Sequence, residues 1–216
     1  MPSMKKFPSS AGNKGFKPLA DYIHSKGLKF GIHLMRGVPK VAVEKNLPIM
    51  NTNGIGAGQI YSTTNLCTWL HDNYTIDAAK PGAQEYYNSL FNLYAYWGVD
   101  FVKIDDMSAP IYHEDEIEMV RKAIDKCGRR IVLSLSPGET PIEQASHVSK
   151  KANMWRMVND LWDQWGDVKH LMQVCGKWCP SIASGTWPDC DMIPLGHISI
   201  RGERGEERMT KLSKDE

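Results

Sequence analysis

The sequence has few of the features that mark membrane, nucleic-acid-binding or disulfide-rich proteins. No apolar run approaches the roughly 18 uncharged residues of a membrane-spanning helix, and the opening residues 1–6 lack the apolar core of a signal peptide. The chain also lacks an excess of charge of one sign, because its 26 basic and 25 acidic residues give a net charge of +1. No global field therefore favours nucleic acid or an anionic membrane as a partner.

Cysteine is also scarce. The five cysteines are scattered and odd in number, which argues against a disulfide framework; they are Cys67, Cys127, Cys175, Cys179 and Cys190. Localisation stays open, with a secreted or periplasmic protein as one possibility, and the sequence says nothing about oligomeric state.

Signatures of cofactor chemistry are absent. No P-loop and no Gly-x-Gly-x-x-Gly follows a strand pattern, so the phosphate cradle of a nucleotide or dinucleotide enzyme is missing. Cys175 and Cys179 lie on a predicted helix without a nearby second pair of ligands, which does not fit a zinc site. We therefore expect neither a metal nor a cofactor.

What the chain does contain is a repeated order of helix, Gly-containing turn, apolar strand and polar loop. Its 216 residues are 42% hydrophobic and 24% charged, enough apolar material for one large folded domain. The repeated order is typical of α/β proteins with a parallel sheet. Helices are expected at 16–26, 81–97, 114–126, 141–152 and 163–177, and strands at 28–34, 99–105, 131–136, 154–160 and near 180–183.

Five helix-then-strand units in a row, with no second domain between them, favour part of a (β/α)8 TIM barrel over a doubly wound sheet. The segment 34–81 is too long for an ordinary connection, which predicts a lid or binding loop, with a mobile glycine-rich stretch at 51–58. Ser213 to Glu216 has the form of a helix capping box, yet no helix follows. Residues 1–216 are therefore expected to be the central part of one barrel domain, about strands three to seven of eight.

Barrel enzymes work at the carboxyl ends of their strands, so polar residues there are candidates for the site. In the strand 99–105, alternation places Phe101, Lys103 and Asp105 on one face. A Lys and an Asp pointing into the barrel mouth need charged or hydroxylated partners to offset desolvation. A charge pair that only closes the barrel top is the alternative. Asp106 is the weaker candidate, facing outward or lying in the loop.

Other strand ends add further candidates. Arg156 and Asp160 share parity on the strand 154–160, which supplies a second carboxylate. Asp163 fits the N-cap of the next helix better than a catalytic role. His33 is either a satisfied core residue or a substrate contact. Trp187, with the nearby Asp191, has the composition of a sugar-binding motif.

Two carboxylates across a barrel mouth, surrounded by cationic side chains, fit cleavage of a glycosidic bond. One carboxylate attacks the anomeric carbon while the other protonates the leaving oxygen. A metal-dependent barrel hydrolase is the alternative, but inward-pointing Lys and Arg side chains would repel a cation.

The ordered motifs resemble family 27 glycoside hydrolases, the melibiase-type α-galactosidases, over nearly the whole chain. They are LADYIHSKGLKFGIH (19–33), WGVDFVKID (97–105), WRMVND (155–160) and WPDCDM (187–192). The resemblance implies Asp105 as nucleophile and Asp160 as acid/base of a retaining, exo-acting enzyme. It also implies that Lys103, Arg156 and Asp191 bind the sugar, and that His33 takes a position usually filled by tyrosine.

The departures from the family pattern concern specificity. In LSLSPG (133–138), Ser136 stands where a Glu-containing segment commonly reads the sugar's 2-position, which leaves room for a larger substituent. Met107 replaces one partner of the usual cysteine pair. The first two strands, which read the galactose hydroxyls in the family, the last strand and the C-terminal β-sandwich domain are not in this chain.

The leading hypothesis is an α-galactosidase acting on galactoside oligosaccharides or glycans. The alternatives are α-N-acetylgalactosaminidase, β-L-arabinopyranosidase or a catalytically inert fragment. The 216-residue chain alone is expected to be inactive, because five parallel strands cannot close a barrel.

Overall fold

The computed structural model describes residues 2–198 and 206–215, and its centre is a five-stranded parallel sheet. The strand order β1-β5-β6-β7-β8 follows the chain, so each strand is added beside the preceding one. The strands are β1 (Gly31–Met35), β5 (Phe101–Asp105), β6 (Val132–Leu135), β7 (Met154–Arg156) and β8 (Trp187–Asp189). Sequential parallel strands are the arrangement of a (β/α) barrel, which confirms the predicted α/β class.

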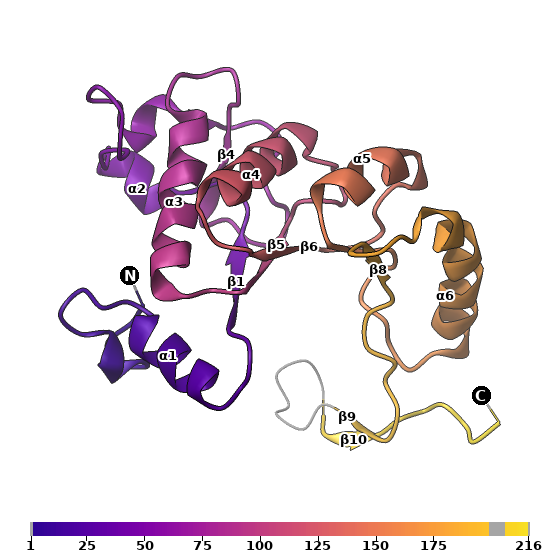
Figure 1. Cartoon of the computed structure of the whole chain (residues 1–216). Coiled ribbons are helices and arrows are strands. Elements are labelled where there is room, and N and C mark those ends of the chain that lie inside the picture. Colours follow the sequence, from indigo (N-terminus) through magenta and orange to yellow (C-terminus); the bar gives the residue numbers. More distant parts are fainter. Residues whose placement is uncertain (1, 199–205, 216) are drawn as a thin grey trace.

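Helices alternate with these strands, and Figure 1 shows α3 to α6 succeeding one another along one side of the sheet. Their bounds lie within two residues of those predicted, except that the fourth begins as a 3-10 turn. The helical elements are η1 (Pro8–Ser10), α1 (Lys17–Ser25), α3 (Ala83–Trp97), α4 (Glu114–Lys126), η3 (Ile142–Gln144), α5 (Ala145–Lys151), α6 (Trp165–Trp178) and η4 (Cys179–Ser181). Among the described residues, no helix is long and apolar enough to cross a membrane.

The core lies between the sheet and these helices. Val102 and Ile104 of β5 are buried, with 0% and 1% of their surface exposed. Lys103 and Asp105 alternate with them and are half-buried on the opposite face. The predicted parity of this strand is therefore confirmed, and it leaves the two polar side chains on the face away from the helices.

The fifth strand is not where the sequence placed it. The stretch 180–183 was predicted as a strand, but Pro180 lies in the 3-10 turn η4 that extends α6, and Ile182 and Ala183 are exposed. The strand that completes the sheet is Trp187–Asp189, paired in parallel with Met154–Arg156. Proline is favoured in the first turn of a helix because the N–H that it lacks would have no partner there. Pro180 therefore fits the 3-10 turn better than a strand.

The segment 36–77 is also more regular than the long loop predicted. It contains α2 (Lys40–Glu44), η2 (Ala57–Gln59) and an antiparallel sheet of order β2-β4-β3, formed by Val38–Pro39, Asn73–Ile76 and Tyr61–Ser62. The glycine-rich stretch is closed by a backbone hydrogen bond of 2.9 Å from Ile49 to Ile55.

Near the C-terminus, β9 (His197–Ile198) and β10 (Arg208–Met209) pair antiparallel. The structure corrects the role of Asp163. Helix α6 begins at Trp165 with Gln164 as its N-cap, while the buried Asp163 carboxylate accepts hydrogen bonds from Arg208 and from the Lys211 amide. Arg208 lowers the pKa of Asp163 well below its usual value. The capping box expected at 213–216 lies partly outside the described residues.

Candidate active site

A cleft of about 710 Å³ lies at the carboxyl ends of β5, β6 and β7. The two carboxylates singled out in the sequence, Asp105 and Asp160, both line it. The other polar or aromatic residues of its wall are Trp69, Lys103, Ser136, Glu139 and Asn159. The cleft therefore brings together side chains from three neighbouring strands, as expected for a site at the top of a barrel.

The last residue of β5 is Asp105, with Lys103 two residues earlier on the same face. Strand β1 runs beside β5 with His33 opposite Lys103 and Met35 opposite Asp105. His33 is exposed on the same sheet but does not line the cleft. His33 and Lys103 therefore lie at the same level of the sheet, two residues before the level of Met35 and Asp105.

The strand predicted to run to residue 160 ends at Arg156, so Asp160 lies in the loop beyond β7 and not on its strand face, with its side chain 58% exposed. Arg156, the last residue of β7, is only 3% exposed. Its Nη1 lies 3.4 Å from Asp160 Oδ1, and its Nη2 lies 3.1 Å from Asp191 Oδ2. Asp191 also accepts a hydrogen bond of 2.8 Å from the Leu161 amide. Asp191 therefore ties the loop after β8 to the loop that carries Asp160.

Arg156 has spare donor capacity. Neither its Nε nor its Nη2 has a hydrogen-bond acceptor of suitable geometry among the described residues, although both atoms are buried. Buried guanidinium donors without acceptors are costly, and a polar ligand removes that cost. Because both atoms are buried and Arg156 does not line the cleft, Arg156 acts on the site by holding Asp160 and Asp191 in place.

Two further residues expected at the site differ in where they lie. Ser136 is 3% exposed and lines the cleft just after β6. Trp187 is 57% exposed and begins β8, opposite Met154 in register, so it lies at the far end of the strand from the cleft. The structure thus gathers Lys103, Asp105, Ser136 and Asp160 in one cleft, with Arg156 and Asp191 behind Asp160.

The sequence analysis missed Trp69 and Glu139. Trp69 belongs to the segment after β3, where nothing in the local pattern indicates that it folds back over the strand ends. Glu139 follows Gly138, whose backbone packs so closely that an added Cβ would lie 1.9 Å from the Val158 carbonyl oxygen. A glycine that permits such close approach of two loops is a signal that could have directed attention to Glu139.

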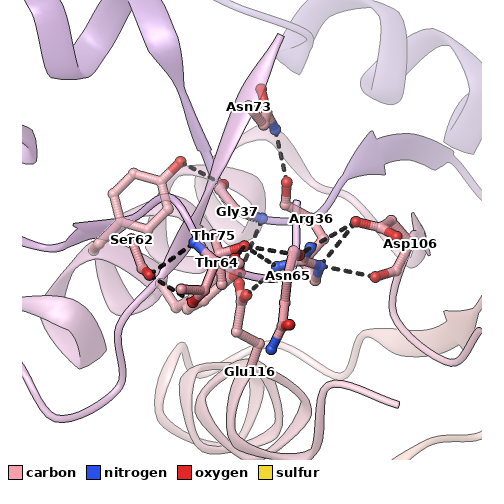
Figure 2. A network of polar contacts seen from close by, with 11 residues as sticks. Arg36, Gly37, Ser62, Thr64, Asn65, Asn73, Thr75, Asp106 and Glu116 are labelled. Carbon is pink, nitrogen blue, oxygen red and sulfur yellow. Dashed lines mark hydrogen bonds and ion pairs between the residues drawn. The ribbon is translucent and has the colours of Figure 1, made fainter. Parts of the chain in front are cut away.

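The sequence analysis also missed a buried polar network beneath Asp105, shown in Figure 2. Arg36 follows β1 directly and contacts Asp106 and Glu116, with side-chain exposures of 2%, 5% and 3%. Burial raises the pKa of Asp106 and of Glu116 above the usual values, and Arg36 offsets only part of this effect. Asp106 was expected in the loop or facing outward; it does lie in the loop just after β5, with its carboxylate buried against Arg36. Since Arg36 follows a predicted strand end, the rule that located Asp105 could have located it.

Across residues 2–198 and 206–215, no group of three or more His, Cys, Asp or Glu side chains is placed to hold a metal ion. Cys175 Sγ lies 3.8 Å from Cys190 Sγ, and Cys179 is exposed.

A parallel (β/α) sheet with two carboxylates in one cleft at its strand ends is the architecture of a barrel glycosidase. The family model described as Alpha galactosidase A, of the melibiase type, matches residues 66–213, more than half of the chain. The chain belongs to this family, which is family 27 of the glycoside hydrolases, and its fold is part of a TIM barrel.

Solved structures of the family match the whole chain. A β-L-arabinopyranosidase from Geobacillus stearothermophilus is 55% identical, with a TM-score of 0.92 over 100% of this chain and 50% of its own. A variant of that enzyme has been solved in complex with arabinose. A Bacillus halodurans protein provisionally described as an α-N-acetylgalactosaminidase is 46% identical, with a TM-score of 0.80 over 100% of this chain and 50% of its own.

Among curated proteins, an α-galactosidase from Oryza sativa is 26% identical over 91% of this chain and 38% of its own length. The chain thus spans well under half the length of this curated relative, and half of the Geobacillus and Bacillus structures.

Proposed function

We propose that this chain carries the catalytic centre of a retaining glycosidase that releases a terminal sugar with the ring configuration of galactose. The observation that supports it most strongly is that Asp105 and Asp160, from the ends of β5 and β7, line one cleft together with Lys103. Glycosidases of this class need two carboxyl groups on opposite sides of the scissile bond.

In the proposed mechanism, Asp105 attacks the anomeric carbon and forms a covalent glycosyl–enzyme ester. Asp160 donates its proton to the leaving oxygen, then takes a proton from the water that hydrolyses the ester. The exposure of Asp160 gives water and the leaving group access to it, whereas the half-buried Asp105 lies deeper in the cleft.

The cations have complementary roles. Lys103 lies on the face of β5 that carries Asp105 and lines the same cleft, where its ammonium donates to sugar hydroxyls. Arg156 holds Asp160 and Asp191 by ion pairs on the other side of the site, and the family resemblance implies that it also binds the sugar. Ser136 also lines the cleft, and the family resemblance implies that it faces the substituent at the sugar's 2-position.

For the sugar itself, we place β-L-arabinopyranoside first. β-L-Arabinopyranose has the ring configuration of α-D-galactose without the hydroxymethyl group, so the same two carboxylates serve both sugars. Identity to the Geobacillus arabinopyranosidase is 55% over the whole chain, against 26% to the rice α-galactosidase. This reverses the order given by sequence motifs alone, which put α-galactosidase first.

α-Galactosidase is the second candidate, favoured by the family model that matches residues 66–213. α-N-Acetylgalactosaminidase is the third, favoured by the small Ser136 in the cleft and by the 46% identity to the Bacillus halodurans protein. We further propose that residues 1–216 form the central part of a single barrel domain and that the isolated segment is inactive, because the sugar-reading strands of the family are not in it.

The test is a comparison of kcat/KM on nitrophenyl β-L-arabinopyranoside, α-D-galactoside and α-N-acetylgalactosaminide, with the full-length protein that carries this chain. The highest value is expected on the arabinopyranoside, unchanged by a chelator. A preference for the galactoside would promote the second candidate. Proton NMR of the first sugar released should show retained anomeric configuration; inversion would contradict the double-displacement mechanism.

A further inference from the structure

Arg36 is bonded to the backbone that carries the proposed nucleophile. Its amide donates to the Asp105 carbonyl at 3.1 Å, and its Nε donates to the Asp106 carbonyl at 2.8 Å. Its Nη2 adds a hydrogen bond of 2.7 Å to the Asp106 carboxylate. One residue thus holds both peptide units that follow the Asp105 Cα.

The same guanidinium also bonds the segment that leads to Trp69. Nη2 donates to the Asn65 carbonyl at 2.8 Å, and Nη1 donates to Thr75 Oγ1 at 3.2 Å. Thr75 in turn donates to the Asn65 carbonyl at 3.0 Å. Trp69, four residues beyond Asn65, lines the cleft with Asp105. Arg36 therefore links Asp106, which follows Asp105 in the chain, to Asn65 in the segment that leads to Trp69 (Figure 2 shows Arg36, Asp106 and Asn65).

Arg36 has no donor left for a substrate. Each of its three side-chain nitrogens donates to two acceptors, including Glu116 Oε1 at 2.5 Å from Nη1. A guanidinium has five N–H groups, so this arrangement uses all of them. Its side chain is also 2% exposed. Arg36 can thus affect catalysis only through the backbone that it holds.

Stability alone is a weak explanation for this network. Burying one cation with two carboxylates costs desolvation that their attraction barely repays, and apolar packing of similar volume stabilises as well or better. The network also holds Asp106 in the left-handed region, at φ 62°, which is unfavourable for a residue with a Cβ. The backbone is also closely packed at Gly37, where an added Cβ would lie 2.1 Å from the Tyr74 carbonyl oxygen.

We propose that Arg36 is a positioning residue for Asp105: it fixes the backbone at the end of β5 and the segment leading to Trp69 in one catalytic geometry. The inference rests on the proposed function, in which Asp105 is the nucleophile.

The test compares Arg36→Lys with Arg129→Lys in the full-length protein. Arg129 is the matched control because it also bonds β5, but at the opposite end, donating to Val99 O at 2.8 Å and to Asp100 Oδ1 at 2.7 Å. Lysine keeps the charge at both positions but cannot supply the fork of donors. A fluorosugar inactivator first measures the number of active sites, and then the rate constant for esterification per active site.

Arg36→Lys is expected to lower kcat and the esterification rate constant per active site by about 10- to 100-fold, with KM changed by less than about threefold. Arg129→Lys should keep both within about twofold of the parent. Partial unfolding alone would reduce the number of titrated sites without changing the rate constant, so a parental rate constant in Arg36→Lys would overturn the inference.

If Arg36→Lys does not fold, the esterification rate constant of Asp106→Asn tests the inference in its place. It keeps the side-chain shape but weakens the bonds to Arg36, and it should lower the rate constant by about 3- to 10-fold. A parental value would again overturn the inference. A parent enzyme that is inactivated without an ester on Asp105 would overturn the proposed function, and the inference with it. An ester on Asp105 combined with parental rates in the variants would overturn the inference alone.

Discussion

Strand β5 is held by an arginine at each end, and the two ends differ in burial and charge. At its start, Arg129 bonds Asp100, with side-chain exposures of 33% and 12%, and His24 Nε2 lies 2.7 Å from the same carboxylate. At its finish, Arg36 and Asp106 are buried, with exposures of 2% and 5%. The amino end is a partly hydrated ion pair, whereas the carboxyl end is a desolvated network beneath the cleft.

The pKa shifts of the carboxylates at the two ends have opposite signs. Burial alone raises the pKa of Asp100, but hydrogen bonds from Phe30, His24 and Arg129 outweigh it and leave the pKa below its usual value. Burial raises the pKa of Asp106 and Glu116, and Arg36 does not fully compensate. In barrels, the amino ends of strands serve stability and the carboxyl ends serve the reaction. We infer that β5 follows this division, with hydrated ion pairs just before Phe101 and the proposed nucleophile at Asp105.

The sharpest contrast between the ends is expected from Asp105→Ala and Asp100→Asn. Asp105→Ala removes the proposed nucleophile and should lower kcat by about 10⁴-fold or more. Asp100→Asn should leave kcat within about twofold, because it lies at the opposite end of the strand. Steady-state kinetics on a nitrophenyl glycoside measure both. Comparable losses in the two variants would show that the division between the ends is wrong.

A second contrast concerns the leaving group. Asp160→Ala should cost about 10²- to 10⁴-fold on natural glycosides, whose poor leaving groups need a proton, and much less on activated aryl glycosides. The measurement is kcat/KM across a series of leaving groups of different pKa. Equal losses along the series would exclude Asp160 as the acid/base.

A smaller effect is expected at the aromatic wall of the cleft. Trp69→Ala should raise KM by about 5- to 10-fold, roughly 1 to 1.4 kcal/mol, with kcat changed less. Trp165→Ala is the control, because this tryptophan is similarly exposed, at 38% against 44%, but does not line the cleft. Initial-rate measurements distinguish the two. An unchanged KM in Trp69→Ala would remove this residue from the substrate site.

The smallest expected effect is a difference in pH dependence between the ends. The pKa of Asp100 is depressed on folding, so its stabilisation is present above the unfolded pKa and lost as pH falls through the folded pKa. The pKa of Glu116 is raised, so its contribution is present below the unfolded pKa and lost as pH rises through the folded pKa.

The stability lost in Asp100→Asn, relative to the parent, should therefore shrink on acidification. The stability lost in Glu116→Gln should instead grow as the pH is lowered. Urea unfolding of the full-length protein at a series of pH values measures both. Slopes of the same sign would contradict the assigned pKa directions.

Much of the fold could be predicted from the sequence because helical periodicity, glycine turns and β-branched strands are local signals. The helix at Glu114–Lys126 and the strand parity of Lys103 and Asp105 are confirmed. The strand Trp187–Asp189 was missed because it is only three residues long and contains a proline. Its place in the sheet depends on pairing with β7, which no local pattern records.

The residues of the candidate site also fall into two groups, those that the sequence could predict and those that it could not. The carboxylates at strand ends could be predicted, since topology alone brings strand ends together. Trp69 and the partners of Arg36 could not, because they depend on how the segment 36–77 folds into its own small sheet over the end of β5. Asp163 was misassigned as a helix cap because its partner, Arg208, lies 45 residues away.

The most direct test of the account is to identify the residue that forms the covalent intermediate. The full-length protein would be inactivated with a 2-deoxy-2-fluoro glycoside of the preferred sugar, digested, and the labelled peptide sequenced by mass spectrometry. We predict a single ester on Asp105, at the carboxyl end of β5. An ester on Asp106 or Asp160, or turnover of the inactivator without any ester, would contradict the account.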